Sequence, residues 1–269
     1  MTDIGNKSRD GRWSLKGMNA LVTGGTQGIG YAIVEELASF GATIYTCTLS
    51  QEDLNKCLHE WKVKGYKVTG SVCDLSSRSE TQQLMEKVAN YFNGKLHILV
   101  TVNNAATVIT KQITDFTAED YSVIMSTNFE APYHLSQLSH PLLKATGQGS
   151  IVFVSSISGQ FGVPYVSLYS GSKGAINSVT KCMACEWAKD GIRVNAVAPW
   201  IIDTPLKDSA GVQPAFKVVA ERAIERTPIS RLGKPNEVSS VVAFLCLPAA
   251  SWLTGQIITL DGGKTAYGL

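Results

Sequence analysis

Short runs rich in β-branched and aliphatic residues alternate with longer stretches of helical periodicity along almost the whole chain. The short runs cover residues 18–22, 42–47, 67–73, 98–102, 150–154, 192–197 and 256–260. Helical patterns cover residues 29–40, 52–63, 80–92 and 118–144, and another begins near residue 169. Strands that alternate with helices form βαβ units, which place the strands parallel in one sheet. We therefore predict an α/β fold with a seven-stranded parallel sheet and helices on both faces.

Composition and charge narrow the possible functions. With 269 residues, 44% of them hydrophobic, the chain can bury a large core, and no linker or internal repeat divides it. The net charge is +2 and both signs are spread along the chain, so neither nucleic acid nor a membrane surface is an expected partner. No apolar run could span a bilayer, and the first dozen residues lack the apolar stretch of a signal peptide. We expect a soluble, cytoplasmic protein that binds a small molecule.

Two segments stand outside the alternating pattern. Residues 1–11 are polar and predict a flexible N-terminal extension, which leaves residues 12–269 as the single folded domain. Residues 205–228 interrupt the pattern directly after a predicted strand. Because ligands bind at the carboxyl ends of parallel strands, we predict that this segment is a lid over a substrate.

Cysteine and histidine spacing gives no support for a metal site. The 6 cysteines contain one C-x-x-C pair, Cys182 and Cys185, and the 4 histidines are scattered. Structural zinc sites usually need paired blocks of such ligands, so we expect no metal. Because Cys182 and Cys185 lie within a helical pattern, we interpret them as core residues rather than as a redox pair.

A glycine-rich loop joins the first predicted strand to the first predicted helix. It reads Gly24-Gly25-Thr26-Gln27-Gly28-Ile29-Gly30. Backbone amides at such a helix N-terminus can hold a pyrophosphate, and glycine lets the phosphate approach closely. The spacing differs from G-x-G-x-x-G, so a turn that only packs helix against strand remains the alternative. In its strand–loop–helix context, the loop predicts a dinucleotide-binding Rossmann fold.

The end of the second predicted strand bears on the choice of dinucleotide. A carboxylate there binds the 2′-hydroxyl of the adenine ribose and repels a 2′-phosphate. In this chain the segment reads Cys47-Thr48-Leu49-Ser50. It contains no acid, which argues against strict use of NAD, and no arginine, which removes the usual support for NADP.

Tyr169 and Lys173 are four residues apart, so on a helix they share one face and can form a proton-transfer pair. The same spacing recurs at Tyr91 and Lys95, which shows how weak the pattern is alone. In the second copy an Asn93-Gly94 turn signal separates the two residues. Helical periodicity continues after Lys173, so the first copy is the candidate.

Several features together resemble the short-chain dehydrogenase/reductases. They are the glycine loop, Asn103-Asn104-Ala105-Ala106, Ser155-Ser156, Tyr169 with Lys173, and Val197-Ala198-Pro199. The resemblance extends from Arg12 to the C-terminus, and residues 11–17, 184–190 and 244–250 are similar to plant tropinone reductases. It implies an oxidoreductase of plant specialised metabolism that reduces a ketone with NADP(H).

The resemblance further implies a catalytic tetrad of Asn128, Ser156, Tyr169 and Lys173. Tyr169 would protonate the carbonyl oxygen during reduction, and Lys173 with the nicotinamide charge would lower the pKa of its phenol. Ser156 would hydrogen-bond the carbonyl, and Asn128 would anchor a water that links Lys173 to solvent. Taken alone, Ser156 could equally cap a turn, and Asn128 could be a helix hydrogen-bonding residue.

The same resemblance assigns the cofactor contacts, with NADP(H) as the expected cofactor and NAD(H) as the alternative. Gln27 and Leu49 stand where tropinone reductases usually carry basic residues, so we expect activity with both cofactors. The expected contacts, besides Tyr169 and Lys173, are Gly24, Thr26, Gln27, Gly28, Ile29, Gly30, Thr48, Leu49, Asp74, Leu75, Asn104, Ala105, Ala106, Pro199, Ile202 and Thr204.

Three further positions depart from the family pattern. Thr101 and Val102 lengthen the fourth strand by two residues, and an even insertion preserves the facing of side chains along a strand. Ala106 replaces a common glycine, which suggests a backbone without positive φ. Trp200 follows Pro199 where glycine is usual, so it is either a bulky wall beside the nicotinamide or a core tryptophan.

None of the residues at substrate-facing positions is charged. A tropinone reductase often orients its ammonium substrate with a charged or basic side chain, and Thr110 and Val166 offer none. We therefore expect a neutral, terpenoid-like cyclic ketone or secondary alcohol. The expected substrate contacts are Thr110, Ser156, Ser158, Val166, Tyr169, Trp200 and Leu206.

Two other functions share parts of this pattern. A catalytically silent dinucleotide-binding protein could use the same sheet, because a fold does not fix a function. Sugar-nucleotide epimerases also use a Tyr-x-x-x-Lys pair, but they resemble longer chains with a larger C-terminal domain and different glycine spacing. The family resemblance also implies a homodimer or homotetramer.

Overall fold

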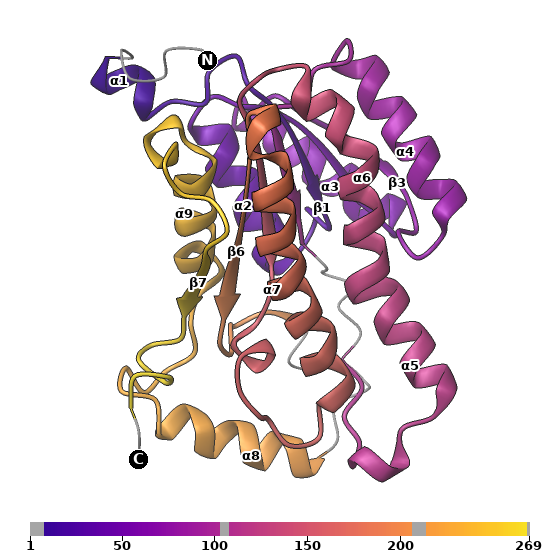
Figure 1. Cartoon of the computed structure of the whole chain (residues 1–269), viewed down its shortest axis with the longest axis vertical. Helices are drawn as coiled ribbons and strands as arrows, with labels where there is room; N and C mark the ends of the chain where they lie inside the picture. Colours follow the sequence, from indigo (N-terminus) through magenta and orange to yellow (C-terminus); the bar gives the residue numbers. More distant parts are fainter. Residues whose placement is uncertain (1–7, 103–107, 206–213, 268–269) are drawn as a thin grey trace.

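The computed structural model describes residues 8–102, 108–205 and 214–267, without the side chains of residues 214, 215 and 217. Seven parallel strands form one sheet in the order β3-β2-β1-β4-β5-β6-β7 (Figure 1). This confirms the predicted fold class and all seven strands. The strands are β1 (Asn19–Thr23), β2 (Thr43–Thr48), β3 (Val68–Val72), β4 (Ile98–Thr101), β5 (Gly149–Val154), β6 (Ile192–Pro199) and β7 (Ile257–Leu260).

Helices cover both faces of the sheet. One core cluster joins the sheet to α2, α3 and α9, and a second joins it to α4, α6 and α7. The helices are α1 (Arg9–Arg12), α2 (Gly28–Ser39), α3 (Gln51–Val63), α4 (Arg78–Tyr91), α5 (Ala118–Met125), α6 (Ala131–Lys144), α7 (Ser167–Trp187), α8 (Pro214–Glu225) and α9 (Pro235–Cys246).

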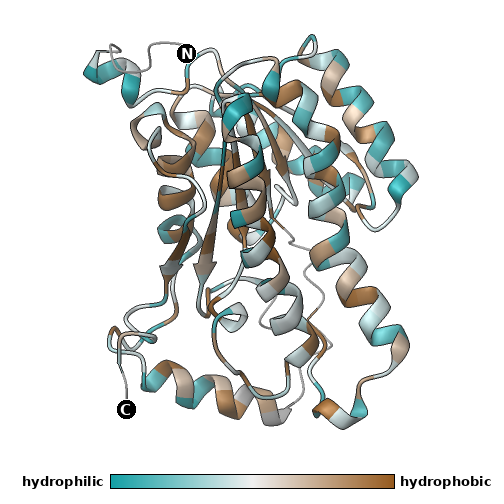
Figure 2. Cartoon of the chain, viewed as in Figure 1, coloured by the Kyte–Doolittle hydropathy of each residue, from teal (hydrophilic) through white to brown (hydrophobic). Residues whose placement is uncertain are grey.

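The two core clusters follow the two faces of each strand. In β1, Ala20 and Val22 belong to the cluster under α2 and α9, whereas Leu21 belongs to the cluster under α4 and α7. Side chains that alternate between faces are the rule for a strand, and both faces here are apolar because both are covered. Figure 2 shows the hydrophobic residues gathered on the strands and on the helix surfaces that face them.

The chain reverses its winding direction at β1, which lies between β2 and β4. At such a switch point a crevice opens outside the carboxyl ends of the strands, and ligands bind there. Val102, which directly follows β4, lies beside the last residue of β1. The Thr23 hydroxyl donates to the Val102 carbonyl at 3.0 Å and accepts from the Val102 amide at 2.9 Å. These two hydrogen bonds join the end of β4 to the end of β1.

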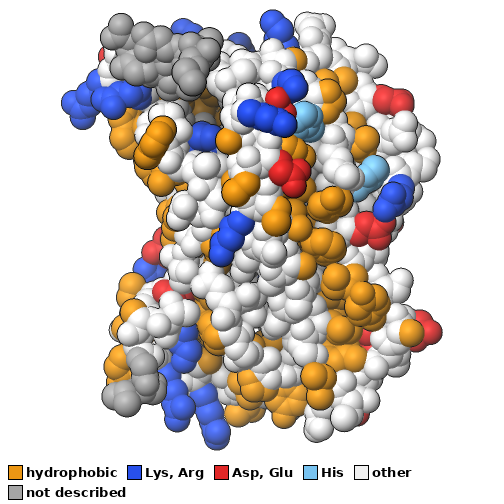
Figure 3. All heavy atoms as spheres, in the orientation of Figure 1, with side chains coloured by type: hydrophobic (Ala, Val, Ile, Leu, Met, Phe, Trp, Pro, Cys, Tyr) orange, Lys and Arg blue, Asp and Glu red, His pale blue; other side chains and the backbone are white. Residues whose placement is uncertain are grey.

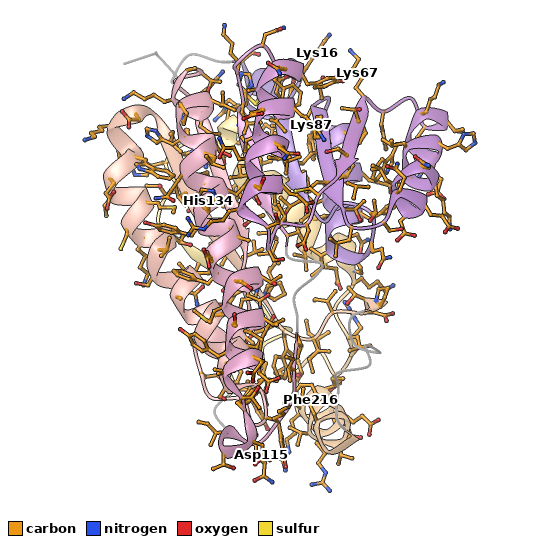
Figure 4. The ribbon with its side chains drawn as sticks, turned by 90° about the vertical axis from the view of Figure 1, so that its right-hand side faces the viewer. Lys16, Lys67, Lys87, Asp115, His134 and Phe216 are labelled. Atoms are coloured by element: carbon orange, nitrogen blue, oxygen red, sulfur yellow. The ribbon has the colours of Figure 1, made fainter. Side chains whose placement is uncertain are left out.

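The carboxyl ends of the strands face a smaller lobe of the molecule. The arrowheads of β6 and β7 point toward the end of the molecule where α8 lies (Figure 1). In Figure 4, Phe216 of α8 and Asp115 lie at that end, while Lys16, Lys67 and Lys87 lie at the opposite one. Helix α8 falls within the segment 205–228 that the sequence predicts to be a lid, and residues 206–213 lie outside the described part.

The helix expected over residues 118–144 is not regular throughout. A π-helical turn, Ser126–Glu130, separates α5 from α6, and the buried Asn128 lies in this turn. Such turns are frequent at functional sites, because the extra residue changes where side chains point.

The interpretation of Cys182 and Cys185 as core residues is wrong. Both are exposed free thiols on α7. The buried face of α7 carries Lys173, Ile176 and Met183 instead. Because successive helical residues are about 100° apart, Cys182 turns away from the core while Met183 points into it.

Candidate active site

The glycine loop is shaped by close contact between the backbone and the neighbouring strand. Gly24 and Gly28 have φ angles of +60° and +52°, which are strained for residues with a side chain. A Cβ on Gly25 would lie 2.1 Å from Oγ1 of Thr46 and 2.8 Å from Val34, so only glycine fits. Helix α2 begins at Gly28, directly after the glycine loop, and its N-cap residue Gln27 makes no side-chain cap hydrogen bond. This arrangement can hold a phosphate group against a helix N-terminus.

A cavity of about 200 Å³ lies beside the glycine loop, at the ends of β2 and β3. Oγ1 of Thr26 and Oγ1 of Thr48 are 3.0 Å apart and join the loop to β2. Leu49 is 59% exposed at this cavity. Most of the adenine-side contacts predicted from sequence therefore lie together. The predicted residues that line the cavity are Gly24, Thr26, Gln27, Thr48, Leu49, Asp74 and Leu75.

The sequence analysis missed Asp53, which also lines this cavity. Asp53 lies in the first turn of α3, where Ser50 caps the helix by accepting from its amide at 3.1 Å. Its Oδ2 accepts a hydrogen bond from Nε2 of Gln27 at 3.1 Å. The strand end itself carries no acid, as the sequence indicates, but the first turn of α3 brings the Asp53 carboxylate to the same cavity. The cap at Ser50 was the sequence signal that could have located it.

Ser156, Tyr169 and Lys173 converge at the carboxyl ends of β5 and β6. Oγ of Ser156 donates to the Pro199 carbonyl at 3.5 Å and accepts from the Ser158 amide at 3.2 Å. The Ser158 hydroxyl lies 3.0 Å from the same oxygen. Nζ of Lys173 donates to the Val154 carbonyl at 2.9 Å and lies 5.5 Å from the centre of the Tyr169 ring.

Burial changes the ionisation of both members of the Tyr169–Lys173 pair. It raises the pKa of the Tyr169 phenol to about 12, and a hydrogen bond with Ser156 offsets part of that rise. It lowers the pKa of the Lys173 ammonium to about 8, because the charged form is desolvated. The phenol is therefore protonated at neutral pH and can act as an acid. The lowered phenol pKa expected from the sequence is not found in the protein alone.

Direct backbone packing holds these groups in place. A short 3₁₀ turn, Ile157–Gly159, lies against α7, and a Cβ on Gly159 would be 2.7 Å from the carbonyl carbon of Lys173. The π-turn that carries Asn128 also contacts α7. Three of the four tetrad residues thus form one cluster, and the turn that carries the fourth packs against the same helix.

Comparison with known proteins agrees with this geometry. Residues 24–265 match the family described as Enoyl-(Acyl carrier protein) reductase. A tropinone reductase homolog from Datura stramonium is 63% identical over 259 residues, which are 96% of each chain. The chain belongs to the short-chain dehydrogenase/reductase family. Within that family it is tropinone reductase-like, since the curated relatives at this level of identity are tropinone reductase homologs of plants.

Solved structures of other short-chain dehydrogenase/reductases have the same fold. A gluconate 5-dehydrogenase from Burkholderia cenocepacia, in complex with NADP and tartrate, has a TM-score of 0.87 and 27% identity, covering 97% of this chain and 100% of its own. A 7α-hydroxysteroid dehydrogenase in complex with NADH and 7-oxo glycochenodeoxycholic acid has a TM-score of 0.86 and 31% identity, covering 96% and 97%. The fold is shared along nearly the whole length of these chains.

Most of the predicted substrate contacts of this short-chain dehydrogenase/reductase lie in the described part of the chain. Thr110 and Val166 are buried and adjacent, because the Lys111 amide donates to the Tyr165 carbonyl at 2.9 Å. The Ser158 hydroxyl is hydrogen-bonded to the Ser156 hydroxyl. The half-buried Trp200 directly follows Pro199, whose carbonyl accepts from Ser156, and the centre of its ring lies 6.1 Å from that of Phe161.

The remaining predicted contacts are distributed along the same edge of the sheet. Ile29 and Gly30 lie in the first turn of α2, Pro199 ends β6, and Ile202 forms a bridge with Gly233. Ile202 and Trp200 line a second cavity, of about 190 Å³, and Thr204 follows nearby in the chain. Asn104, Ala105, Ala106 and Leu206 lie outside the described residues.

The second Tyr-x-x-x-Lys pattern is confirmed as a decoy. Helix α4 ends at Tyr91, and Asn93 and Gly94 both have positive φ, so Lys95 is not on the same helix. Among the described residues no His, Cys, Asp and Glu side chains gather into a metal-binding group, and no helix there is long and apolar enough to cross a membrane.

Proposed function

We propose that this protein transfers hydride between a nicotinamide cofactor and the carbonyl carbon of a neutral cyclic ketone, or carries out the reverse reaction on the secondary alcohol. The proposal rests above all on the half-buried Tyr169, whose phenol shares a hydrogen bond with Ser156 and lies beside Lys173. Hydride donation is the chemistry that the bound nicotinamide supplies. The other steps fall to side chains of this chain.

Tyr169 acts as the acid in the reduction. Its phenol donates a proton to the carbonyl oxygen as that oxygen gains negative charge, and Ser156 donates a hydrogen bond to the same oxygen. With a pKa of about 12 the phenol is reliably protonated before the step. The Lys173 ammonium, close to the ring, stabilises the phenolate that remains. In this proposal Asn128 anchors a water through which the site regains its proton.

The glycine loop and the cavity beside it support a dinucleotide as the cofactor. Related enzymes of the same fold bind NADP or NADH. The resemblance to tropinone reductases makes NADP(H) the first candidate and NAD(H) the second, and we expect activity with both.

The uncharged surroundings of the site support a neutral substrate. Thr110, Ser158 and Val166 are buried and carry no charge that could orient an ammonium group. In the proposed arrangement residues 205–228 form a lid, and the long helices and β7 join two or four copies of the chain. A cytoplasmic location stays a prediction from the sequence.

A screen of ketones and secondary alcohols with NADPH and NADH tests the proposal. We expect oxidation of either cofactor by uncharged cyclic ketones, with weaker activity on tropinone. Faster turnover of tropinone than of every neutral cyclic ketone would contradict the substrate class. Binding of cofactor without turnover of any compound would favour the catalytically silent protein.

A further inference from the structure

The adenine-ribose cavity carries an unbalanced negative charge. Its described lining includes two carboxylates, Asp53 and Asp74, and no lysine or arginine. Lys56, one helical turn beyond Asp53 on α3, is exposed and does not line the cavity. The cavity therefore differs from a phosphate site, which needs cationic or multiple N–H donors.

Asp53 is held in a fixed position at this cavity. Its amide is bonded to the Ser50 cap, and its Oδ2 accepts from Gln27. The bond to Gln27 links the glycine loop to the start of α3, the two segments that flank the predicted ribose site. The Gln27 amide thus supports the carboxylate at a position where a basic side chain would attract a phosphate.

The two dinucleotides differ only at the ribose 2′ position. A phosphate there carries a charge of about −1.5 to −2 at neutral pH, and beside Asp53 it would meet a like charge, with no lysine or arginine in the described lining to balance it. A 2′-hydroxyl can instead donate a hydrogen bond to a carboxylate. Leu49 offers the adenine ring an apolar contact that is the same for both dinucleotides.

We propose that Asp53, supported by Gln27, selects NAD(H) over NADP(H) by accepting a hydrogen bond from the 2′-hydroxyl and repelling a 2′-phosphate. This inference rests on the proposed function and deepens it, since it reverses the cofactor ranking that the family resemblance implies. Asp53 is a specificity-determining residue in this role, and it takes no part in hydride or proton transfer.

Binding measurements that need no turnover test this inference. NADH and NADPH are titrated by fluorescence, and 5′-AMP and 2′,5′-ADP by calorimetry, which isolates the adenosine half. We expect the wild-type protein to bind NADH about tenfold tighter than NADPH, and 5′-AMP tighter than 2′,5′-ADP. Asp53→Asn removes the charge of this side chain and keeps its size. In this variant the Kd values for NADPH and NADH should differ by less than about threefold.

Glu52→Gln is the matched control, because it removes the same charge from the adjacent residue of α3, outside the cavity. It should leave the ratio of the Kd values for NADPH and NADH unchanged. Added salt should reduce the difference between these Kd values more in the wild-type protein than in Asp53→Asn. Salt screens the repulsion between Asp53 and the 2′-phosphate, and the variant lacks that repulsion.

Three results would overturn the inference. The first is that NADPH binds the wild-type protein as tightly as NADH. The second is that the ratio of the Kd for NADPH to the Kd for NADH is the same in Asp53→Asn as in the wild type. In either case turnover with a ketone would leave the proposed function standing. If neither dinucleotide binds at all, the proposed function fails together with the inference.

Discussion

Burial shifts the ionisation of the two side chains at the centre of the site in opposite directions. The pKa of Tyr169 rises to about 12 and that of Lys173 falls to about 8, since each side chain favours its neutral form when desolvated. The site is thus prepared for reduction, in which the phenol must hold a proton until the carbonyl needs it. Oxidation needs the phenolate, so it requires additional positive charge near the ring.

The Lys173 pKa has a measurable consequence for stability. Between about pH 8 and pH 10 the folded protein releases this proton while the unfolded chain, with a lysine pKa near 10.5, retains it. Unfolding therefore takes up protons, and the free energy of unfolding contributed by Lys173 increases with pH over this range. The Tyr169 contribution has the opposite sign but acts above about pH 10.

Urea unfolding of the cofactor-free wild type and Lys173→Met across this range tests that expectation. We expect the wild type to gain roughly 2 kcal/mol relative to the variant between pH 8 and pH 10. Other titrating groups cancel in the difference. Parallel stability curves for the two proteins would show that the ammonium is not desolvated as the structure indicates.

Single residues also show where reasoning from sequence stops. The Tyr169–Lys173 pair, Ser156 and the glycine loop could be found, because each lies at a fixed spacing within one element or at its end. For Asp53 the Ser50 cap indicates only a place in the first turn of α3, and the packing of α3 beside the glycine loop is what brings it to the cavity. The cysteines of α7 were misassigned because small apolar residues cover more than one face of that helix, and packing decides which face is buried.

At the scale of elements, the contact between the 3₁₀ turn and α7 sets the distance between the serines and the Tyr169–Lys173 pair. At Gly159 the two backbones meet with no room for a Cβ, which would lie 2.7 Å from the Lys173 carbonyl carbon and 2.8 Å from the Gly174 amide nitrogen. Backbone atoms cannot move aside as a flexible side chain can. A larger residue must push the turn away from the helix.

We expect Gly159→Ala to lower kcat by about 10- to 100-fold through misplacement of Ser156, with cofactor affinity nearly unchanged. Gly162→Ala is the control, since a Cβ there meets nothing within 4 Å, and it should keep wild-type kcat. Steady-state kinetics and cofactor titration measure both effects. Equal kcat values for the two variants would contradict the positioning role of this contact.

Element boundaries were predictable to within two residues for most strands and helices, because most strands coincide with short runs of β-branched and aliphatic residues. The π-turn at Ser126–Glu130 was not, since the apolar pattern of residues 118–144 continues through it. Val102, directly after β4, is a second case. Its hydrogen bonds to Thr23 depend on the pairing of β4 with β1, which local sequence does not specify.

For the whole molecule, the outer surface of α5 and α6 bears on how copies associate. Tyr121, Val123 and Tyr133 there are 55%, 46% and 38% exposed, and hydrophobic side chains gather over these helices in Figure 3. Exposed apolar surface of this kind is frequently covered by another copy. We expect a dimer or larger assembly in sedimentation experiments.

Val123→Glu combined with Tyr133→Glu should weaken that association by placing charges where apolar contact is expected. Val63→Glu is the comparison variant, because Val63 is 75% exposed at the end of α3, away from this surface. It should leave the assembly intact. A wild-type protein that sediments as a monomer would contradict the expectation.

The central claim is that the Tyr169 phenol supplies the proton for ketone reduction, and one pair of variants tests it directly. Rates of NADH and NADPH oxidation with the best neutral ketone are compared for the wild type, Tyr169→Phe and Tyr91→Phe. We predict a loss of roughly 10²- to 10⁴-fold in kcat for Tyr169→Phe, with cofactor binding retained, and wild-type rates for Tyr91→Phe. A Tyr169→Phe protein that turns over as fast as Tyr91→Phe would contradict the account.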